Sequence, residues 1–215
     1  MQAIISKYLI SDNMNAILQH MKIYLHNTLS GEREEFKPIQ DGKVGIYNCG
    51  PTVYDTVHIG NLRTSVMADI LRRVFEYNKY SVMQVMNITD IDDKTIKRSQ
   101  EKKISLQELT RHYETVFMAN LHSMNILTPH KILRATEHIE DMIKMISTLL
   151  EKGMAYKAKD GVYFSIWKFK DYGKLAKLAI DEENADENSK ESNKMRERIK
   201  NDEYDKENAQ DFALW

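Results

Sequence analysis

The sequence predicts an α/β fold built around a parallel sheet. Two short apolar runs, Val44–Asn48 and Ser81–Met86, are typical of buried strands. Between them, Asn61–Tyr77 carries apolar residues at helical spacing and contains neither glycine nor proline. A strand, a glycine-containing loop, a helix and a second strand within about 40 residues form a βαβ unit, and such a unit predicts parallel strands.

Elements on either side of this unit follow the same periodicity rules. Residues 1–21 predict an N-terminal extension with a weak helical pattern, and Lys22–Leu29 alternates like a short strand. Two helices are predicted downstream, over Ser105–Asn125 and over Thr136–Lys152, the second capped by its first residue. A β-hairpin is predicted over 155–167, because the Asp-Gly pair in its middle favours a tight turn.

Bulk composition narrows the class of protein. The chain has 215 residues, 42% of them hydrophobic, which is enough for one core with an appendage. No apolar run approaches the roughly 20 residues that span a bilayer, so no membrane contact is expected. The formal net charge is −1, so a nucleic-acid partner would be recognised by a local patch or by shape. The single cysteine excludes an internal disulfide and indicates the reducing cytoplasm.

The segment His58-Ile59-Gly60-Asn61 follows the first strand and opens the helix. Open α/β sheets bind ligands at this position, beyond the carboxyl ends of the strands. Gly60 lets a bound group approach the backbone, and the N–H groups of the first helical turn attract phosphate. His58 can add a hydrogen bond to charge that develops on phosphorus. The alternative is that Asn61 is only an N-cap and His58 a loop residue.

Cys49 ends the first strand and allows three interpretations. It can be a small buried hydrophobic residue, a nucleophile or a metal ligand. A nucleophile needs a neighbouring base, and only His58 is near in the sequence. A zinc site needs three further ligands, and this sequence holds no second cysteine to provide one.

The run Asn87–Lys94 follows the second strand. Its aspartates, Asp90, Asp92 and Asp93, predict the N-terminus of a helix; a site for a hard cation is the weaker alternative. Thr89 stands at the carboxyl end of the second strand. It is therefore expected to line the same crevice as Cys49 and His58.

Together these stretches resemble the cysteinyl-tRNA synthetases, which are class I aminoacyl-tRNA synthetases with a HIGH motif. The resembling segments are FKPI (Phe36–Ile39), YNCGPTVYDTVHIGN (Tyr47–Asn61), NITDIDDKTIKRS (Asn87–Ser99), RATEHI (Arg134–Ile139) and DFALW (Asp211–Trp215). The resemblance implies the first half of a Rossmann-like, HUP-type parallel sheet with a helical and hairpin connective insertion. The implied domains are an N-terminal extension (1–21), the first half of the catalytic domain (22–133), the connective insertion (134–180), an acidic mobile loop (181–208) and a return strand into the catalytic domain (209–215).

The resemblance also implies roles for particular residues. His58 and Asn61 would be catalytic, although Asn61 stands where the generic motif has histidine. The implied contacts to ATP or the adenylate come from Gly50, Pro51, Thr52, His58, Gly60, Asn61, Thr64, Asn87 and Ile88. The implied contacts to cysteine come from Cys49, Tyr54, Thr89 and Trp215. Cys49 would be one of four zinc ligands, with the zinc binding the substrate thiolate.

The implied function is a cysteine–tRNA ligase of cytoplasmic translation. It would be a monomeric enzyme that holds zinc. Its substrates would be ATP, as the complex with magnesium, together with L-cysteine and tRNA(Cys). In such synthetases the other zinc ligands, the lysine-rich loop and the anticodon-binding domain follow the DFALW segment. We therefore expect this chain to be a truncated unit, inactive alone. The alternatives are a cysteine ligase of the mycothiol-synthesis type and a non-catalytic fragment or binding module.

Overall fold

The computed structural model describes residues 22–177 and 211–215. The predicted N-terminal extension (1–21) and acidic loop (181–208) lie outside the described residues. The chain folds into two compact units. Within the described residues, the first unit holds 22–24 and 35–139, and the second holds 25–34, 140–177 and 211–215.

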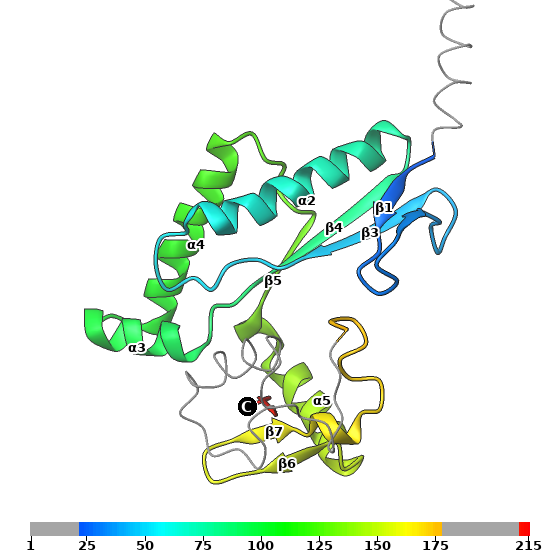
Figure 1. Ribbon diagram of the computed structural model, residues 1–215. Coiled ribbons are helices and arrows are strands. Elements are labelled where there is room, and N and C mark those ends of the chain that lie inside the picture. The colour runs from blue at the N-terminus through cyan, green and yellow to red at the C-terminus, as the bar shows by residue number, and fades with distance from the viewer. Residues whose placement is uncertain (1–21, 178–210) are drawn as a thin grey trace, which may run out of the picture. The chain divides into compact units, whose positions relative to one another are not determined.

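The first unit is built on a three-stranded parallel sheet. Strand β3 (Lys43–Asn48) pairs with β4 (Ser81–Ile88), and β4 pairs with β5 (Lys131–Arg134), in the order β3-β4-β5. Helix α2 (Ile59–Tyr77) connects β3 to β4 and runs alongside both strands (Figure 1). The predicted βαβ unit and its parallel sheet are confirmed. Strand β5 was not predicted, because only two of its four residues are apolar.

Helix α4 (Leu106–Ser123) supplies four of the seven residues in the main buried cluster of this unit. The Ser105 side chain accepts a hydrogen bond from the Glu108 backbone N–H and so caps the predicted helix. Residues spaced four apart on α4 form one face that packs with Val53 and β4, since i and i+4 share a helix face. The buried cluster consists of Val53, Met86, Ile88, Leu109, Tyr113, Phe117 and Leu121. Burying each large side chain is worth about 1.5–3 kcal/mol.

The aspartates after β4 do not all act as helix caps. Asp92 caps α3 (Asp93–Lys102) by accepting from Lys94 N at 2.9 Å, as predicted. Asp90 is instead buried, with 4% of its surface exposed, and accepts from the backbone N–H and the hydroxyl of Thr136. The prediction that Asp90 caps the helix is therefore wrong, since a buried carboxylate needs donors and Thr136 supplies two.

The predicted helix over 136–152 begins later than the sequence pattern indicates. A short 3₁₀ helix, η1 (Ala135–His138), comes first, and α5 (Ile139–Glu151) follows it. Thr136 is not an N-cap because it lies inside η1, where its hydroxyl and its N–H both donate to Asp90.

The second unit contains α5 and a three-stranded antiparallel sheet. Strands β6 (Ala155–Lys157) and β7 (Val162–Phe164) form the predicted hairpin, and β8 (Phe212–Ala213) pairs with β7. Residues 209–215 were expected to return into the catalytic domain as a strand. In the structure, the strand in this segment, β8, pairs with β7 of the hairpin. Asp211 fixes it by accepting from Tyr156 Oη at 2.8 Å and Ile166 N at 3.1 Å. The remaining elements are β1 (Tyr24–His26), β2 (Arg33–Glu35) and η2 (Ile166–Lys168).

In the part of the chain that the structure describes, every helix is too short or too polar to cross a membrane.

Candidate functional site

The chain leaves β3 by crossing over the end of β4 at Gly50. The Gly50 N–H donates to Asn87 Oδ1 at 3.1 Å. A Cβ atom built on Gly50 would lie 1.8 Å from the Asn87 carbonyl oxygen, closer than a real Cβ atom comes to any such neighbour. Only glycine fits this crossing, and the crossing determines where the neighbouring Cys49 lies.

The two strand ends stay together beyond the crossing. Thr52 and Thr89 form a parallel bridge, in which Thr89 N donates to Pro51 O at 3.1 Å and Val53 N donates to Thr89 O at 3.2 Å. The Asn87 amide also reaches Thr89, with 3.4 Å between Nδ2 and Oγ1. Thr89 therefore lies at the same sheet end as Gly50, because both bond to Asn87. The expectation that Thr89 shares a crevice with Cys49 and His58 stays a prediction.

The start of α2 is organised by His58 rather than by Asn61. His58 is the N-cap, and its Nδ1 accepts from the Gly60 N–H at 3.0 Å. Asn61 is the third helical residue, and its Oδ1 accepts from the His58 N–H at 3.2 Å. The alternative that Asn61 is the N-cap is therefore wrong. The two residues form a capping box, in which His58 is the N-cap and Asn61 is the third helical residue.

This cap determines what the His58 ring can offer. A neutral imidazole that accepts at Nδ1 carries its proton at Nε2, so Nε2 is left as a donor. The Gly60 N–H is occupied by the ring and is not available to an anion in this arrangement, contrary to the expectation for the first helical turn. A Cβ on Gly60 would also lie 2.8 Å from a ring carbon of His58.

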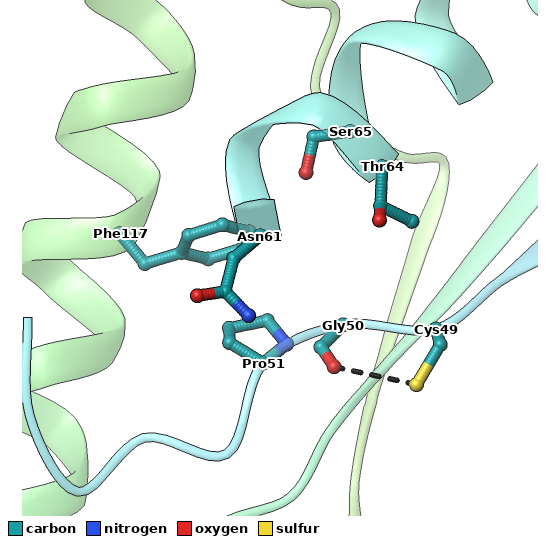
Figure 2. A pocket seen from close by; sticks show the side chains of 7 residues that line it. All are labelled: Cys49, Gly50, Pro51, Asn61, Thr64, Ser65 and Phe117. Carbon is teal, nitrogen blue, oxygen red and sulfur yellow. Dashed lines mark hydrogen bonds between the residues drawn. The ribbon is translucent and has the colours of Figure 1, made fainter. Parts of the chain in front are cut away.

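A pocket of ≈ 130 Å³ lies between the β3 end and the start of α2 (Figure 2). Asn61, Thr64 and Ser65 reach it from the helix, opposite the segment that carries Cys49, Gly50 and Pro51. Cys49 is exposed, and its Sγ lies 3.4 Å from Gly50 O. The pocket thus brings together five of the predicted site residues: Cys49, Gly50, Pro51, Asn61 and Thr64.

Two lining residues, Ser65 and Phe117, were not predicted. Ser65 lies four residues after Asn61, so helical spacing alone indicated that it shares the Asn61 face. Phe117 comes from α4 and carried no local signal, because its periodicity predicts only a core position.

Other predicted site residues lie elsewhere. Thr52, His58, Gly60, Asn87 and Thr89 are at the crossing or the helix cap but do not line this pocket.

Three further predicted contacts are placed differently. Ile88 is 0% exposed within the core, so its side chain is not open to a nucleotide. Tyr54 lines a second pocket, with residues of α3. Trp215 belongs to the second unit, where its carbonyl accepts from Val162 N at 3.0 Å. The roles of Tyr54 and Trp215 toward cysteine stay predictions.

The described residues do not by themselves fit a zinc site. A tetrahedral site needs four ligands, commonly cysteine and histidine. Among the residues that the structure describes, no three His, Cys, Asp or Glu side chains gather as metal ligands do. Cys49 is the one thiol of the chain, so it supplies at most one ligand.

Two ion pairs lie on the first unit, which also carries the pocket. The backbone N–H of Thr56 lowers the pKa of Asp55, and the guanidinium of Arg98, 2.8 Å away, lowers it further. Glu114 holds Arg134 through contacts as short as 2.6 Å and raises the pKa of that guanidinium. The second pair attaches β5 to α4 and so helps to hold the sheet on which the site stands.

Comparison with known proteins agrees with the sequence motifs. The family model of the class I (C) tRNA synthetase catalytic domain matches residues 35–215. A cysteine–tRNA ligase of Brachyspira hyodysenteriae is 45% identical over 193 residues, which cover 90% of this chain and 39% of that protein. One from Thermococcus kodakarensis is 44% identical over 199 residues, covering 91% and 39%. The chain therefore spans 39% of the length of these curated relatives.

Among solved structures, arginyl-tRNA synthetase from Plasmodium falciparum is similar with a TM-score of 0.44 and 15% identity, over 59% of this chain and 30% of that one. The family match covers most of the chain and confirms the resemblance seen in the motifs. The chain belongs to the class I cysteinyl-tRNA synthetase family, with residues 35–215 matching its catalytic domain.

Proposed function

We propose that this chain provides the cysteine- and ATP-binding part of a cysteine–tRNA ligase. The enzyme would act as a monomer in the cytoplasm and attach L-cysteine to tRNA(Cys). The observation that carries the proposal is the pocket that Cys49 lines together with Asn61 and Thr64 at the β3 end. Family membership supports the same chemistry.

The proposed reaction has two steps. A carboxylate oxygen of L-cysteine attacks the α-phosphorus of ATP, supplied with magnesium, and the bond to pyrophosphate breaks. A terminal ribose hydroxyl of the tRNA then attacks the carbonyl carbon of the adenylate, and AMP leaves. Negative charge develops on phosphate oxygens in the first step, so donors at the pocket rim would stabilise it.

Three side chains of this chain are suited to that task. His58 has Nε2 as a donor because Nδ1 is engaged by Gly60. Asn61 accepts from His58 N through Oδ1, which leaves the amide nitrogen to donate toward the pocket. The Thr64 hydroxyl lies on the same helical face, one turn further along α2. We assign His58 and Asn61 to the phosphates and Thr64 to the adenylate.

The remaining assignments concern the crossing and the amino acid. The backbone from Gly50 to Thr52 would contact the adenylate, with Asn87 beside it. Thr89, Tyr54 and Trp215 would shape the cysteine pocket.

Cys49 would serve as one of four zinc ligands, the other three lying outside the described residues. A bound zinc would select a thiolate over the hydroxyl of serine. Because the described residues supply one ligand, we propose that the 215-residue chain alone neither holds zinc tightly nor activates cysteine at a useful rate. Cysteine-dependent exchange of pyrophosphate into ATP measures this directly. Robust exchange by the isolated chain would contradict the proposal.

Ligand binding tests the function without requiring turnover. Isothermal titration of the chain with a non-hydrolysable cysteinyl-adenylate analogue should show binding that weakens in His58→Ala and Asn61→Ala. His112→Ala is a matched control, because His112 is an exposed helical histidine outside the pocket. An analogue that does not bind, or one whose affinity is the same in all variants, would contradict the proposed function.

A further inference from the structure

Helix α2 lies along one face of the parallel sheet and carries apolar residues on both of its own sides (Figure 1). Its inner side holds the buried positions, among them Ala68 and Phe75. On the outer side, four large apolar residues each keep 39–63% of their surface exposed. We call them the α2 stripe; they are Met67, Ile70, Val74 and Tyr77.

The spacing of the α2 stripe favours a packing partner. Single exposed apolar side chains are common on protein surfaces and need no explanation. The stripe is continuous instead, because its residues follow one another at intervals of three, four and three. This is the spacing at which one helix packs along another. A helix that is apolar on both sides is usually covered on both.

The chain repeats this spacing upstream of the first unit's sheet. Ile10, Met14, Ile17 and Met21 are apolar at intervals of four, three and four, and polar residues fill most positions between them. They belong to the predicted N-terminal extension, outside the described residues. As a helix, residues 10–21 would present an apolar seam about 16 Å long, and the α2 stripe is about 15 Å long.

The described residues show where this extension joins the first unit. The carbonyl of Ile23 accepts from the Phe36 N–H at 2.7 Å. The Phe36 ring packs against Phe75 of α2, with 4.6 Å between the ring centroids. Phe75 lies two residues before Tyr77, the last residue of the α2 stripe. The extension therefore joins the unit beside the Tyr77 end of the stripe, and a short connection raises its effective concentration there.

We infer that residues 10–21 pack on the α2 stripe as a helix parallel to α2. Met21 lies at the Tyr77 end because the chain enters the unit there, and Ile10 then lies near Met67. The extension would brace the helix whose first turn carries the His58 cap. The inference does not depend on the proposed function, because it concerns the outer side of α2. A second copy of the chain is the other possible occupant.

Hydrogen exchange followed by mass spectrometry measures the docking directly. In the full chain, the amides of residues 11–21 should exchange at least about 10-fold more slowly than in an unstructured peptide. Met67→Lys/Ile70→Lys should abolish this protection. Ile143→Lys/Met145→Lys is the matched control, because it makes the same replacements at exposed positions of α5, in the second unit, and it should keep the protection. Unprotected amides in the native chain, or protection that survives Met67→Lys/Ile70→Lys, would overturn the inference.

A thermodynamic cycle tests whether the two segments touch. Met14→Lys/Ile17→Lys and Met67→Lys/Ile70→Lys should each lower the melting temperature by about 4 °C or more, because each exposes the same apolar seam. The variant with all four replacements should melt within about 2 °C of either pair, since one contact can be lost only once. Additive losses, or no loss in either pair, would contradict the docking.

Protein concentration separates the extension from a second copy of the chain. Packing within one chain does not change on dilution, whereas packing between two copies weakens. The exchange rates of residues 11–21 should therefore stay the same after dilution by about tenfold. Protection that is lost on dilution would mean that the α2 stripe binds a second copy, and the inference would be wrong.

Discussion

Replacing Gly50 by alanine tests whether the crossing at the end of β3 is the structural basis of the site. The added Cβ would lie 1.8 Å from Asn87 O, 3.0 Å from Asn87 C and 3.1 Å from Met86 Cγ. A separation of even 3.0 Å from that oxygen requires the two backbones to move apart by more than about 1 Å, and such overpacking costs about 1–3 kcal/mol. The atom in the way is a backbone oxygen, which cannot rotate aside as a side chain can.

The separation also breaks hydrogen bonds. The Gly50 N–Asn87 Oδ1 bond and the two bonds of the Thr52–Thr89 bridge lie at this crossing. Each is worth about 1 kcal/mol. We therefore expect Gly50→Ala to lower the free energy of unfolding by about 3 kcal/mol or more. For a chain of this size, such a loss corresponds to roughly 6–12 °C in melting temperature.

Gly45→Ala is the matched control. Gly45 lies on the same strand, and its Cβ would meet nothing within 4 Å. That variant should be neutral or gain up to about 1 kcal/mol, because alanine restricts the unfolded chain. Urea unfolding should be followed by far-UV circular dichroism, since Trp167 and Trp215 both lie in the second unit. Free energies for Gly50→Ala and Gly45→Ala within about 0.5 kcal/mol of each other would refute the reasoning.

Two charged groups give further expectations. Arg134→Ala should cost at most about 3–5 kcal/mol in urea unfolding, the cost of a buried charge with no partner, because Glu114, with 10% of its side chain exposed, then keeps only its longer contact with Arg111 at 3.4 Å. Arg134→Met with Glu114→Leu should recover most of that loss, and an equal loss in the double variant would contradict the explanation. The pKa of Asp55 is lowered in the folded state by Thr56 N–H and Arg98, so its stabilisation is complete above the unfolded value of 3.8 and is lost as the pH falls below it. Below pH 3.8 the melting temperature of the native chain should therefore fall more steeply than that of Asp55→Asn; parallel curves would count against this pair.

Local patterns were sufficient for the central elements. Helix α2, helix α4 and strands β3 and β4 appear where apolar periodicity predicted them. This succeeds because each segment must bury one face, and the spacing of apolar residues records which face that is. Strand β5 carries too few residues for a periodicity, so it is recognised only from its pairing with β4.

The candidate site depended more on tertiary structure. The sequence predicted that Cys49, His58 and Thr89 would line one crevice, because the ends of parallel strands and the following helix meet at one edge. The Cys49 pocket is lined by neither His58 nor Thr89; Thr64, which lines it, was indicated only by the family resemblance. The sequence did not predict that Phe117 would close the pocket, or that Tyr54 would face α3 instead. Both depend on packing between segments that lie far apart in the chain.

The sequence by itself determined the family, the βαβ unit and the residues with the chemistry for a phosphate and a thiol. Only the tertiary structure decided that His58 caps α2, that Asp90 pairs with Thr136 and that Gly50 passes against Asn87 O. The physical reason is that propensity and periodicity act over a few neighbouring residues. Which buried donor meets which acceptor is settled when separate segments pack, since every buried polar group must then find a partner.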